Sequence, residues 1–139
     1  MSLSKLVWTK ELSMFNKTLD NQHKTLFIYI NEIIQLEELT PKSGLFAEVL
    51  SRISNYGLEH FKTEERLMIQ MDYPKAIFAR HKAEHKSYLY KVAMFNTNFL
   101  QAGYTEPDEV IDFLKVWWTN HIMFSDMHLS LFIRQNMEK

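Results

Sequence analysis

Every proline in the chain falls within one of three short clusters, and this placement constrains the fold more than any other feature of the sequence. The clusters are TPKSG at 40–44, DYP at 72–74 and AGYTEP at 102–107. Proline ends a helix because it lacks a backbone N–H and clashes with the preceding turn. The clusters therefore divide the chain into four segments, each long enough for a helix of several turns.

Apolar residues recur at steps of three and four within each segment, and no stretch shows the period-two alternation typical of a strand. The residues expected on the inward faces are Leu19, His23, Leu26, Ile30 and Ile33; then Phe46, Leu50, Ile53, Gly57, His60, Glu64, Leu67 and Met71; then Phe78, His81, His85, Tyr88, Val92, Phe95 and Phe99; and finally Val110, Leu114, Trp117, His121, Phe124, His128 and Leu131. This spacing, with short connections, predicts an all-α fold: an antiparallel up-down-up-down four-helix bundle with an N-terminal arm. Nothing suggests a second domain, so residues 1–139 are expected to form one.

The composition excludes several classes of site and partner. The chain has no cysteine, which rules out disulfides, thiolate-bound zinc and iron–sulfur clusters. Its formal net charge is −1 with no basic stripe, so nucleic acid and anionic membranes are poor candidates as partners. No apolar run reaches the roughly 18 residues that a membrane-spanning helix needs. With no signal peptide either, we expect a cytoplasmic protein that does not insert into a membrane.

All six histidines fall on the inward faces, together with one glutamate, Glu64. A buried polar group is costly without a partner, and a single core histidine is ordinarily satisfied by one hydrogen bond. Six such residues are too many for that explanation. In an antiparallel bundle, the residues that reach a similar depth are His23, His60, Glu64, His81, His85 and His121. A cluster of imidazoles and carboxylate without thiolate suits iron, zinc, copper or manganese.

Four motifs carry a resemblance to a known family. They are LDNQHKTLFIYIN at 19–31, HFKTEE at 60–65, HKAEH at 81–85 and WWTNHIMFSD at 117–126. In this order and at these spacings they resemble the hemerythrins, and specifically the bacterial ones. The resemblance runs from Trp8 to Asp126 and implies a single hemerythrin-like domain. The same bundle topology is known in a relative, myohemerythrin.

The resemblance implies a centre of two iron ions joined by an oxo or hydroxo bridge. The implied ligands are His81, His85 and His121 for one iron, His23 and His60 for the other, and Glu64 and Asp126 as bridges. Two octahedral irons have twelve positions, of which these ligands and the bridge fill eleven. The one open position then falls on the two-histidine iron.

An open position beside a second iron suits a diatomic ligand, because two ferrous ions can supply two electrons to O2. The family resemblance implies reversible O2 binding, for carriage, storage or delivery, in a protein that is not an enzyme. The residues that match the lining of the O2 pocket in relatives are Leu26, Phe61, Trp117 and Ile122. Plain core packing accounts for each of these four equally well.

Two other classes of function stay open at this stage. An O2 or redox sensor would act through a protein partner, which the sequence does not identify. A di-iron oxidase, or an enzyme that handles peroxide or nitric oxide, is disfavoured. Ferritin-like oxidases use paired Glu-x-x-His motifs, and this chain has none.

Asp126 is a less obvious ligand, because it follows His121 by five residues and would point about 140° away on an ideal helix. His128 shares the face of His121 but lies roughly 10 Å farther along the helix axis, which is too far for a pair of metals about 4 Å apart. We therefore predict a π-type distortion between His121 and Asp126 that brings the fifth residue into line. His128 is then a surplus packing residue.

Three further positions carry expectations. Leu129 stands where many relatives have tyrosine, so any hydrogen bond from that hydroxyl is absent. Asp20 and Gln22 flank His23 in sequence and are candidates to cap the helix or to orient an imidazole.

Overall fold

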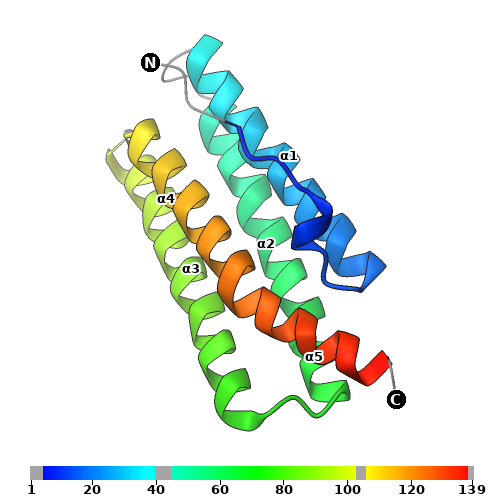
Figure 1. Cartoon of the computed structure of the whole chain (residues 1–139). Coiled ribbons are helices and arrows are strands. Elements are labelled where there is room, and N and C mark those ends of the chain that lie inside the picture. The colour runs from blue at the N-terminus through cyan, green and yellow to red at the C-terminus, as the bar shows by residue number, and fades with distance from the viewer. Residues whose placement is uncertain (1–4, 40–44, 103–105, 138–139) are drawn as a thin grey trace.

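The computed structural model describes residues 5–39, 45–102 and 106–137, and every regular element within these ranges is helical. The elements are a 3-10 turn (Lys10–Leu12), α1 (Lys17–Leu39), α2 (Leu45–Gln70), α3 (Lys75–Ala102), α4 (Pro107–Asn120), a π-helical segment (His121–Asp126) and α5 (Met127–Met137). The last three run on without a break and form the fourth long helix (Figure 1). The predicted all-α class is confirmed, and the helices end at the three proline clusters.

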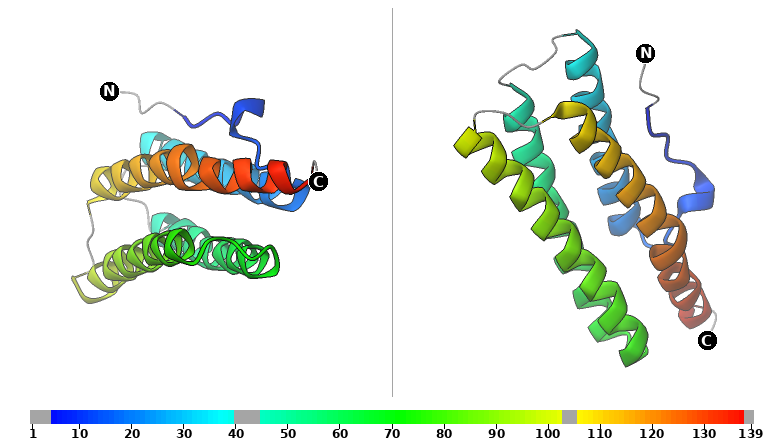
Figure 2. Two further views of the ribbon diagram at one scale, coloured as in Figure 1. Left: turned by 60° about the horizontal axis from the view of Figure 1, so that its bottom comes forward. Right: turned by 90° about the vertical axis from the view of Figure 1, so that its left-hand side faces the viewer.

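The long helices are arranged in two layers. Figure 2 shows α1 beside α4 and α5 in one layer, and α2 beside α3 in the other. Helices that follow one another in the chain run antiparallel (Figure 1), as short connections require. The fold is therefore the predicted up-down-up-down bundle. Among the described helices, none has the length and apolar character needed to cross a bilayer.

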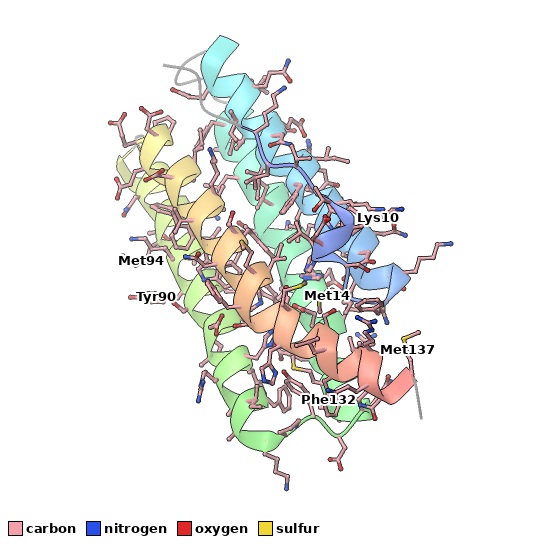
Figure 3. The ribbon with its side chains drawn as sticks, viewed as in Figure 1. Lys10, Met14, Tyr90, Met94, Phe132 and Met137 are labelled. Atoms are coloured by element: carbon pink, nitrogen blue, oxygen red, sulfur yellow. The ribbon has the colours of Figure 1, made fainter. Side chains whose placement is uncertain are left out.

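The residues before α1 form an arm that lies along the outside of the bundle (Figure 2). The side-chain amide of Asn31 holds its first part, accepting from the Leu6 N–H at 2.7 Å and donating to the Leu6 carbonyl at 2.8 Å. Asp20 holds the second part by accepting from the Ser13 hydroxyl and the Met14 N–H, both at 2.7 Å. Asp20 thus fixes the arm and orients no imidazole. The side chain of Met14 is fully buried as a result (Figure 3).

Two hydrophobic clusters fill the interior, and a belt of buried polar residues separates them. The larger, cluster 1, includes Leu26, Ile30, Ile53, Phe61, Tyr88, Leu114, Trp118 and Ile122. The smaller, cluster 2, consists of Met14, Leu19, Met68, Tyr73, Leu129 and Ile133. Of the other residues expected inside, Leu67, Met71 and Phe78 are half-buried at the edge of cluster 2, and the side chain of Phe99 lies outside the described part. The polar belt is thus enclosed by apolar side chains toward both ends of the bundle.

The last part of the fourth helix departs from its predicted inward face. Phe124 and Leu131, expected inside, are 71% and 58% exposed, and His128 is exposed too. The cause is local backbone geometry, because the N–H of Met127 bonds to the carbonyl of Ile122, five residues back. The prediction for these three side chains was wrong because it assumed ideal α-helical periodicity throughout.

The π-helical segment is the distortion that the spacing of His121 and Asp126 predicts. It inserts one extra residue into the turn, so every later side chain is rotated relative to α4. Asp126 and Leu129 are fully buried and Ile133 nearly so. The prediction of a π-type distortion between His121 and Asp126 is confirmed.

Gly57 lies in the middle of α2, facing α3 and α4. A Cβ at this position would lie 3.4 Å from Tyr88 Cε2 and 3.7 Å from Trp118 Cζ2, both ordinary contacts. Because alanine favours a helix interior over glycine by about 0.8–1.0 kcal/mol, we expect Gly57→Ala to raise the free energy of unfolding by roughly 0.5–1 kcal/mol. Urea unfolding would measure the change. Gly57→Val is the control: its branched methyl groups meet the same two rings and should cost about 1–3 kcal/mol.

Candidate metal centre

Seven buried side chains from the four long helices meet in the polar belt. They are His23 from α1, His60 and Glu64 from α2, His81 and His85 from α3, and His121 and Asp126 from the π-helical segment. Each is at most 2% exposed. A step of four residues places both members of a pair on one face of α2 or α3. The π-helical segment achieves the same for a step of five. The structure thus brings together every residue that the sequence suggests as a ligand.

The seven side chains form two overlapping groups. Ligand atoms lie within 4.8 Å of one another among His81, His85, His121 and Glu64, and among His23, His60, Glu64 and Asp126. Glu64 belongs to both groups. Asp126 also spans them, because its Oδ2 lies 3.1 Å from His23 Nε2 and its Oδ1 lies 3.1 Å from His81 Nε2. Two groups that share both carboxylates form a site with places for two neighbouring ions.

The imidazoles of His85 and His121 face each other in a way that favours a cation between them. The Nδ1–H of His85 donates to Glu65 Oε2 at 2.7 Å, and the Nδ1–H of His121 donates to Glu84 Oε1 at 2.8 Å. A neutral imidazole carries one N–H, so each Nε2 then presents a lone pair. These two Nε2 atoms are only 3.2 Å apart. Two lone pairs at this distance repel each other unless a proton or a metal ion lies beside them.

Most of the remaining polar atoms of the belt have no hydrogen-bond partner. The orphaned atoms are both ring nitrogens of His23, the Nε2 atoms of His60 and His81, and both carboxylate oxygens of Glu64 and of Asp126. Several approach one another at 3.1–3.2 Å, but without hydrogen-bond geometry. Buried unsatisfied polar groups are rare and costly, whereas nitrogen and carboxylate oxygen are ordinary ligands of iron, zinc and manganese. The donor set therefore fits a two-metal site.

Charges in the belt are strongly coupled. Burial lowers the pKa of His121, but Asp126, Glu84 and Glu64 outweigh it and raise that pKa to about 10. Burial and the neighbouring Asp126 raise the pKa of Glu64, yet His60 and His85 bring it down to about 2. The pKa of Asp126 is likewise held well below its usual range, chiefly by His121 acting against burial. Without metal, a protonated His121 thus balances part of the carboxylate charge.

Metal binding should release a proton from His121, because a ligating imidazole nitrogen must be unprotonated. Its raised pKa keeps the metal-free side chain protonated at neutral pH. We therefore expect the apparent affinity for Zn²⁺ to rise about tenfold per pH unit between roughly pH 6 and 8 for each proton released. Calorimetry in buffers of different ionisation enthalpy would count the protons. Affinity that stayed constant over this range would contradict the assignment of the proton.

Three residues outside the belt hold the outer nitrogens of three of its histidines. Besides Glu65 and Glu84, the carbonyl of Gln22 accepts from the Nδ1–H of His60 at 2.7 Å. Gln22 thus orients an imidazole as the sequence suggests, although that imidazole is His60 and not its neighbour in sequence. Glu65 and Glu84 were not predicted from the sequence, because in the pattern of their helices they resemble solvated glutamates. Their only signal is that each stands next to an expected ligand.

Aromatic rings cover the three-histidine group. The ring of Phe61 stacks on His85 at 3.9 Å between centroids, and the ring of Trp117 stacks on His121 at 4.5 Å. Trp118 lies on the other side of Phe61 and 5.9 Å from His60. Trp118 is fully buried, whereas Trp117, the tryptophan that was expected on the inward face, is half-buried.

The other two predicted pocket residues, Leu26 and Ile122, are buried in cluster 1 with Phe61. Leu129 lies in cluster 2, on the opposite side of the belt. The surplus histidine, His128, is exposed but not isolated, since its Nδ1 lies 2.8 Å from the buried Tyr73 hydroxyl. Burial, together with the nearby Asp126 and Glu64 carboxylates, raises the pKa of Tyr73 to about 12.

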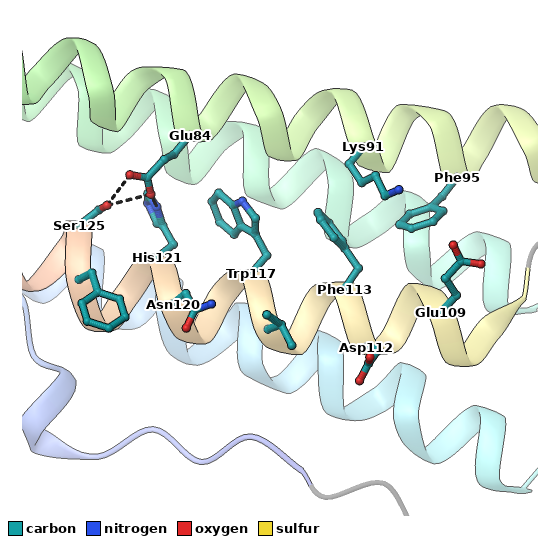
Figure 4. Close-up of a pocket in the computed structure, with 12 residues that line it drawn as sticks. Glu84, Lys91, Phe95, Glu109, Asp112, Phe113, Trp117, Asn120, His121 and Ser125 are labelled. Carbon is teal, nitrogen blue, oxygen red and sulfur yellow. Dashed lines mark hydrogen bonds and ion pairs between the residues drawn. The ribbon is translucent and has the colours of Figure 1, made fainter.

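A groove of about 600 Å³ leads from the surface between α3 and α4 to this centre. Figure 4 shows Trp117 and His121 in its wall, with Glu84 and Ser125 at one end and Phe95 and Glu109 toward the other. The hydrogen bond from His121, together with those from Ser125, lowers the pKa of Glu84 against the opposing effect of burial. Trp117 and His121 are the points at which the groove approaches the polar belt.

Comparison with known proteins agrees with this geometry. Residues 14–130 match the sequence model of the family described as Hemerythrin HHE cation binding domain. The chain belongs to the hemerythrin family. It is 30% identical to a bacteriohemerythrin of Stenotrophomonas maltophilia over 139 residues, covering 94% of this chain and 88% of the relative. It is 31% identical to a bacteriohemerythrin of Pseudomonas aeruginosa over 138 residues, covering 99% of this chain and 87% of the relative.

Solved hemerythrin structures have the same fold. Wild-type hemerythrin superimposes with a TM-score of 0.78 at 26% identity, covering 90% of this chain and 95% of the other. A single-residue variant of hemerythrin gives a TM-score of 0.82 at 27% identity, with 95% and 98% covered. The resemblance carried by the four sequence motifs is therefore confirmed. This hemerythrin combines the family's helical bundle with a buried cluster of histidines and carboxylates.

Proposed function

We propose that this hemerythrin binds O2 reversibly at a non-haem di-iron centre. The proposed ligands are His81, His85 and His121 for one iron, His23 and His60 for the other, and Glu64 and Asp126 as bridges between them. The observation that carries the proposal is the pair of overlapping donor groups whose buried atoms have no other partner. Two ferrous ions, when bound, can lend two electrons to O2 and take them back.

The protein provides different numbers of imidazole donors to the two proposed metal positions. Both carboxylates reach both groups, so the number of imidazoles decides the difference. Three imidazoles and two carboxylates would supply five donors to one ion, whereas His23, His60 and the two carboxylates would supply four to the other. A diatomic ligand would therefore find its place beside His23 and His60. Because the histidines lie on the long helices of the bundle, the unequal number of imidazoles at the two positions is fixed by the fold.

Apolar side chains around the centre would keep water away from the bound gas. Leu26, Phe61 and Ile122 are at most 1% exposed and belong to cluster 1. Trp118 faces His60 and adds to this lining. Exclusion of water and protons favours release of the gas as O2 and disfavours loss of its reduced products. This is the property that separates reversible binding from oxidase activity.

Trp117 lies beside His121 where the groove approaches the centre. Its indole stacks on His121 and lines the groove. Trp117→Ala would open this wall to water, and we expect autoxidation to accelerate by about tenfold, which corresponds to about 1.4 kcal/mol of barrier. The measurement is the rate at which the absorption spectrum of the oxygenated protein decays in air. Val116→Ala, which alters an exposed residue of the same groove, is the matched control and should leave the rate unchanged.

An optical titration tests the proposed function directly. The protein is loaded anaerobically with ferrous iron, the bound iron is counted, and O2 is admitted and then removed. A near-ultraviolet and visible band that appears with O2 and fades on degassing supports reversible binding. A band that appears once and persists as ferric protein supports an oxidase or a redox sensor instead. Failure to bind two irons would overturn the proposal.

A further inference from the structure

The two donor groups differ in the charge of the residues that hold their outer nitrogens. In the three-histidine group, His85 and His121 each donate Nδ1–H to a carboxylate. In the two-histidine group, His60 donates to the neutral amide of Gln22. The outer nitrogen of His23, the other member, is buried and has no partner. Two negative charges thus support one group, and none supports the other in this way.

The carboxylate of Glu84 is held firmly in its position. Its Oε1 and Oε2 accept from the Ser125 hydroxyl at 2.8 and 2.7 Å, while Oε1 also accepts from His121 (Figure 4). Ser125 belongs to the π-helical segment, so Glu84 ties α3 to the turn that presents Asp126. Glu65 is nearer the interior, with a side chain 23% exposed against 37% for Glu84.

The side-chain amide of Gln22, like the carboxylate of Glu84, is held in position by hydrogen bonds. Its Nε2 donates to the Thr63 hydroxyl at 3.2 Å, which leaves Oε1 to accept from His60. This arrangement fixes which end of the amide faces the imidazole, because only the carbonyl oxygen can accept. Gln22 and glutamate have nearly the same shape, so the contrast with Glu65 and Glu84 is one of charge and not of reach.

We propose that Glu65 and Glu84 are positioning residues that give the three-histidine position a higher metal affinity and a lower reduction potential than the two-histidine position. A carboxylate that accepts an Nδ1–H makes the opposite nitrogen of the ring a stronger donor. Stronger donation favours binding of a cation and favours its more highly charged state. The inference rests on the proposed metal centre and adds to it an order of loading and an order of oxidation.

Cobalt titration tests the order of loading. Metal-free protein is titrated with Co²⁺ against a competing chelator, and visible bands distinguish the first bound ion from the second. We expect two resolved steps in the wild type. Glu84→Gln and Glu65→Gln retain an acceptor but remove the charge, and each should weaken the first step by about 10–100-fold while leaving the second within a few-fold. Glu59→Gln, an exposed change on α2, is the matched control.

The reciprocal variant separates this role from a structural one. Gln22→Glu adds a charge behind His60 and should strengthen the second step, so that the two steps converge. In the iron-loaded protein, the same charge removals should raise the lower of the two reduction potentials. A merely structural role would weaken both steps together and would not be reversed at Gln22.

The outcomes keep this inference distinct from the proposed function. Wild-type protein that takes up two ions in one unresolved step overturns the inference and leaves the proposed centre intact. Isotherms of Glu84→Gln and Glu65→Gln that coincide with the wild type also overturn it. Protein that binds no Co²⁺ and no iron overturns the proposed function itself. Circular dichroism of each metal-free variant establishes that the bundle is folded before titration.

Discussion

Loading the protein with two divalent ions is expected to raise its thermal midpoint by roughly 15 °C or more. An ion that binds only the folded chain stabilises it by about 4.1 kcal/mol at a free concentration of 1,000 Kd. For a chain of this size, about 1 kcal/mol moves the midpoint by roughly 3–4 °C. The seven-residue belt explains why the effect should be so large, because metal-free protein buries polar atoms of Glu64, Asp126 and His23 without partners. Differential scanning calorimetry with and without Fe²⁺ or Zn²⁺ would measure it.

Magnesium provides the control for this stabilisation. Mg²⁺ prefers oxygen ligands and retains its water, so a belt rich in imidazole should bind it poorly and the midpoint should hardly move. Equal midpoints for metal-free and Zn²⁺-loaded protein would show that the belt is satisfied without an ion. The repulsion between the Nε2 atoms of His85 and His121 would then have to be relieved by protons alone.

The fold and the belt could be predicted because they depend on helical spacing. Steps of three and four placed His23, His60 and His85 on inward faces, and the structure buries all three. The predicted ligand role of Asp126 depended on a departure from that spacing. Five residues from His121 fit one face only if the helix is locally widened, and the π-helical segment provides this.

The π-helical segment also explains why two side chains were placed wrongly from the sequence. Extending ideal periodicity beyond the π-helical segment placed Phe124 and Leu131 inside, although both are exposed. For Trp117 and Trp118, adjacent positions on a wide inward face look equivalent in sequence. In the structure the deeper place belongs to Trp118, whose ring lies against Gly57 on another helix. Such a contact between helices has no signature in the local pattern.

The contacts of Glu65 and Glu84 could not be predicted from the sequence, for a second reason. Each lies beside a proposed ligand on the flank of an inward face, where glutamate is ordinarily solvated. Whether such a side chain reaches an imidazole depends on how one helix is rotated against the next. His85 lies on α3 while Glu65 lies on α2, and His121 lies beyond α4 while Glu84 lies on α3. Both hydrogen bonds therefore cross between helices, and only the assembled bundle reveals them.

Glu64→Gln is expected to abolish stable binding of two ions while leaving the bundle folded. Glu64 belongs to both donor groups, so its charge serves both positions. Glutamine occupies the same volume, and the metal-free variant should keep the wild-type helix content. Loss of a residue behind a ligand costs about 10–100-fold in affinity, so loss of a shared ligand should cost more than about 100-fold. Metal analysis after gel filtration should find one ion or fewer per chain, against two for the wild type.

Two neighbouring glutamates on the same helix provide comparison variants for this experiment. Glu65→Gln removes a charge behind His85 and should produce an intermediate loss, confined to one binding step. Glu59→Gln alters an exposed side chain immediately before His60 in the sequence and should have no effect. A graded series, in which the loss is largest at 64, smaller at 65 and absent at 59, follows only if the carboxylate of Glu64 itself contacts the ions. Equal losses at 64 and 65 would instead indicate that the charge of the belt as a whole, and not a shared ligand, holds the metal.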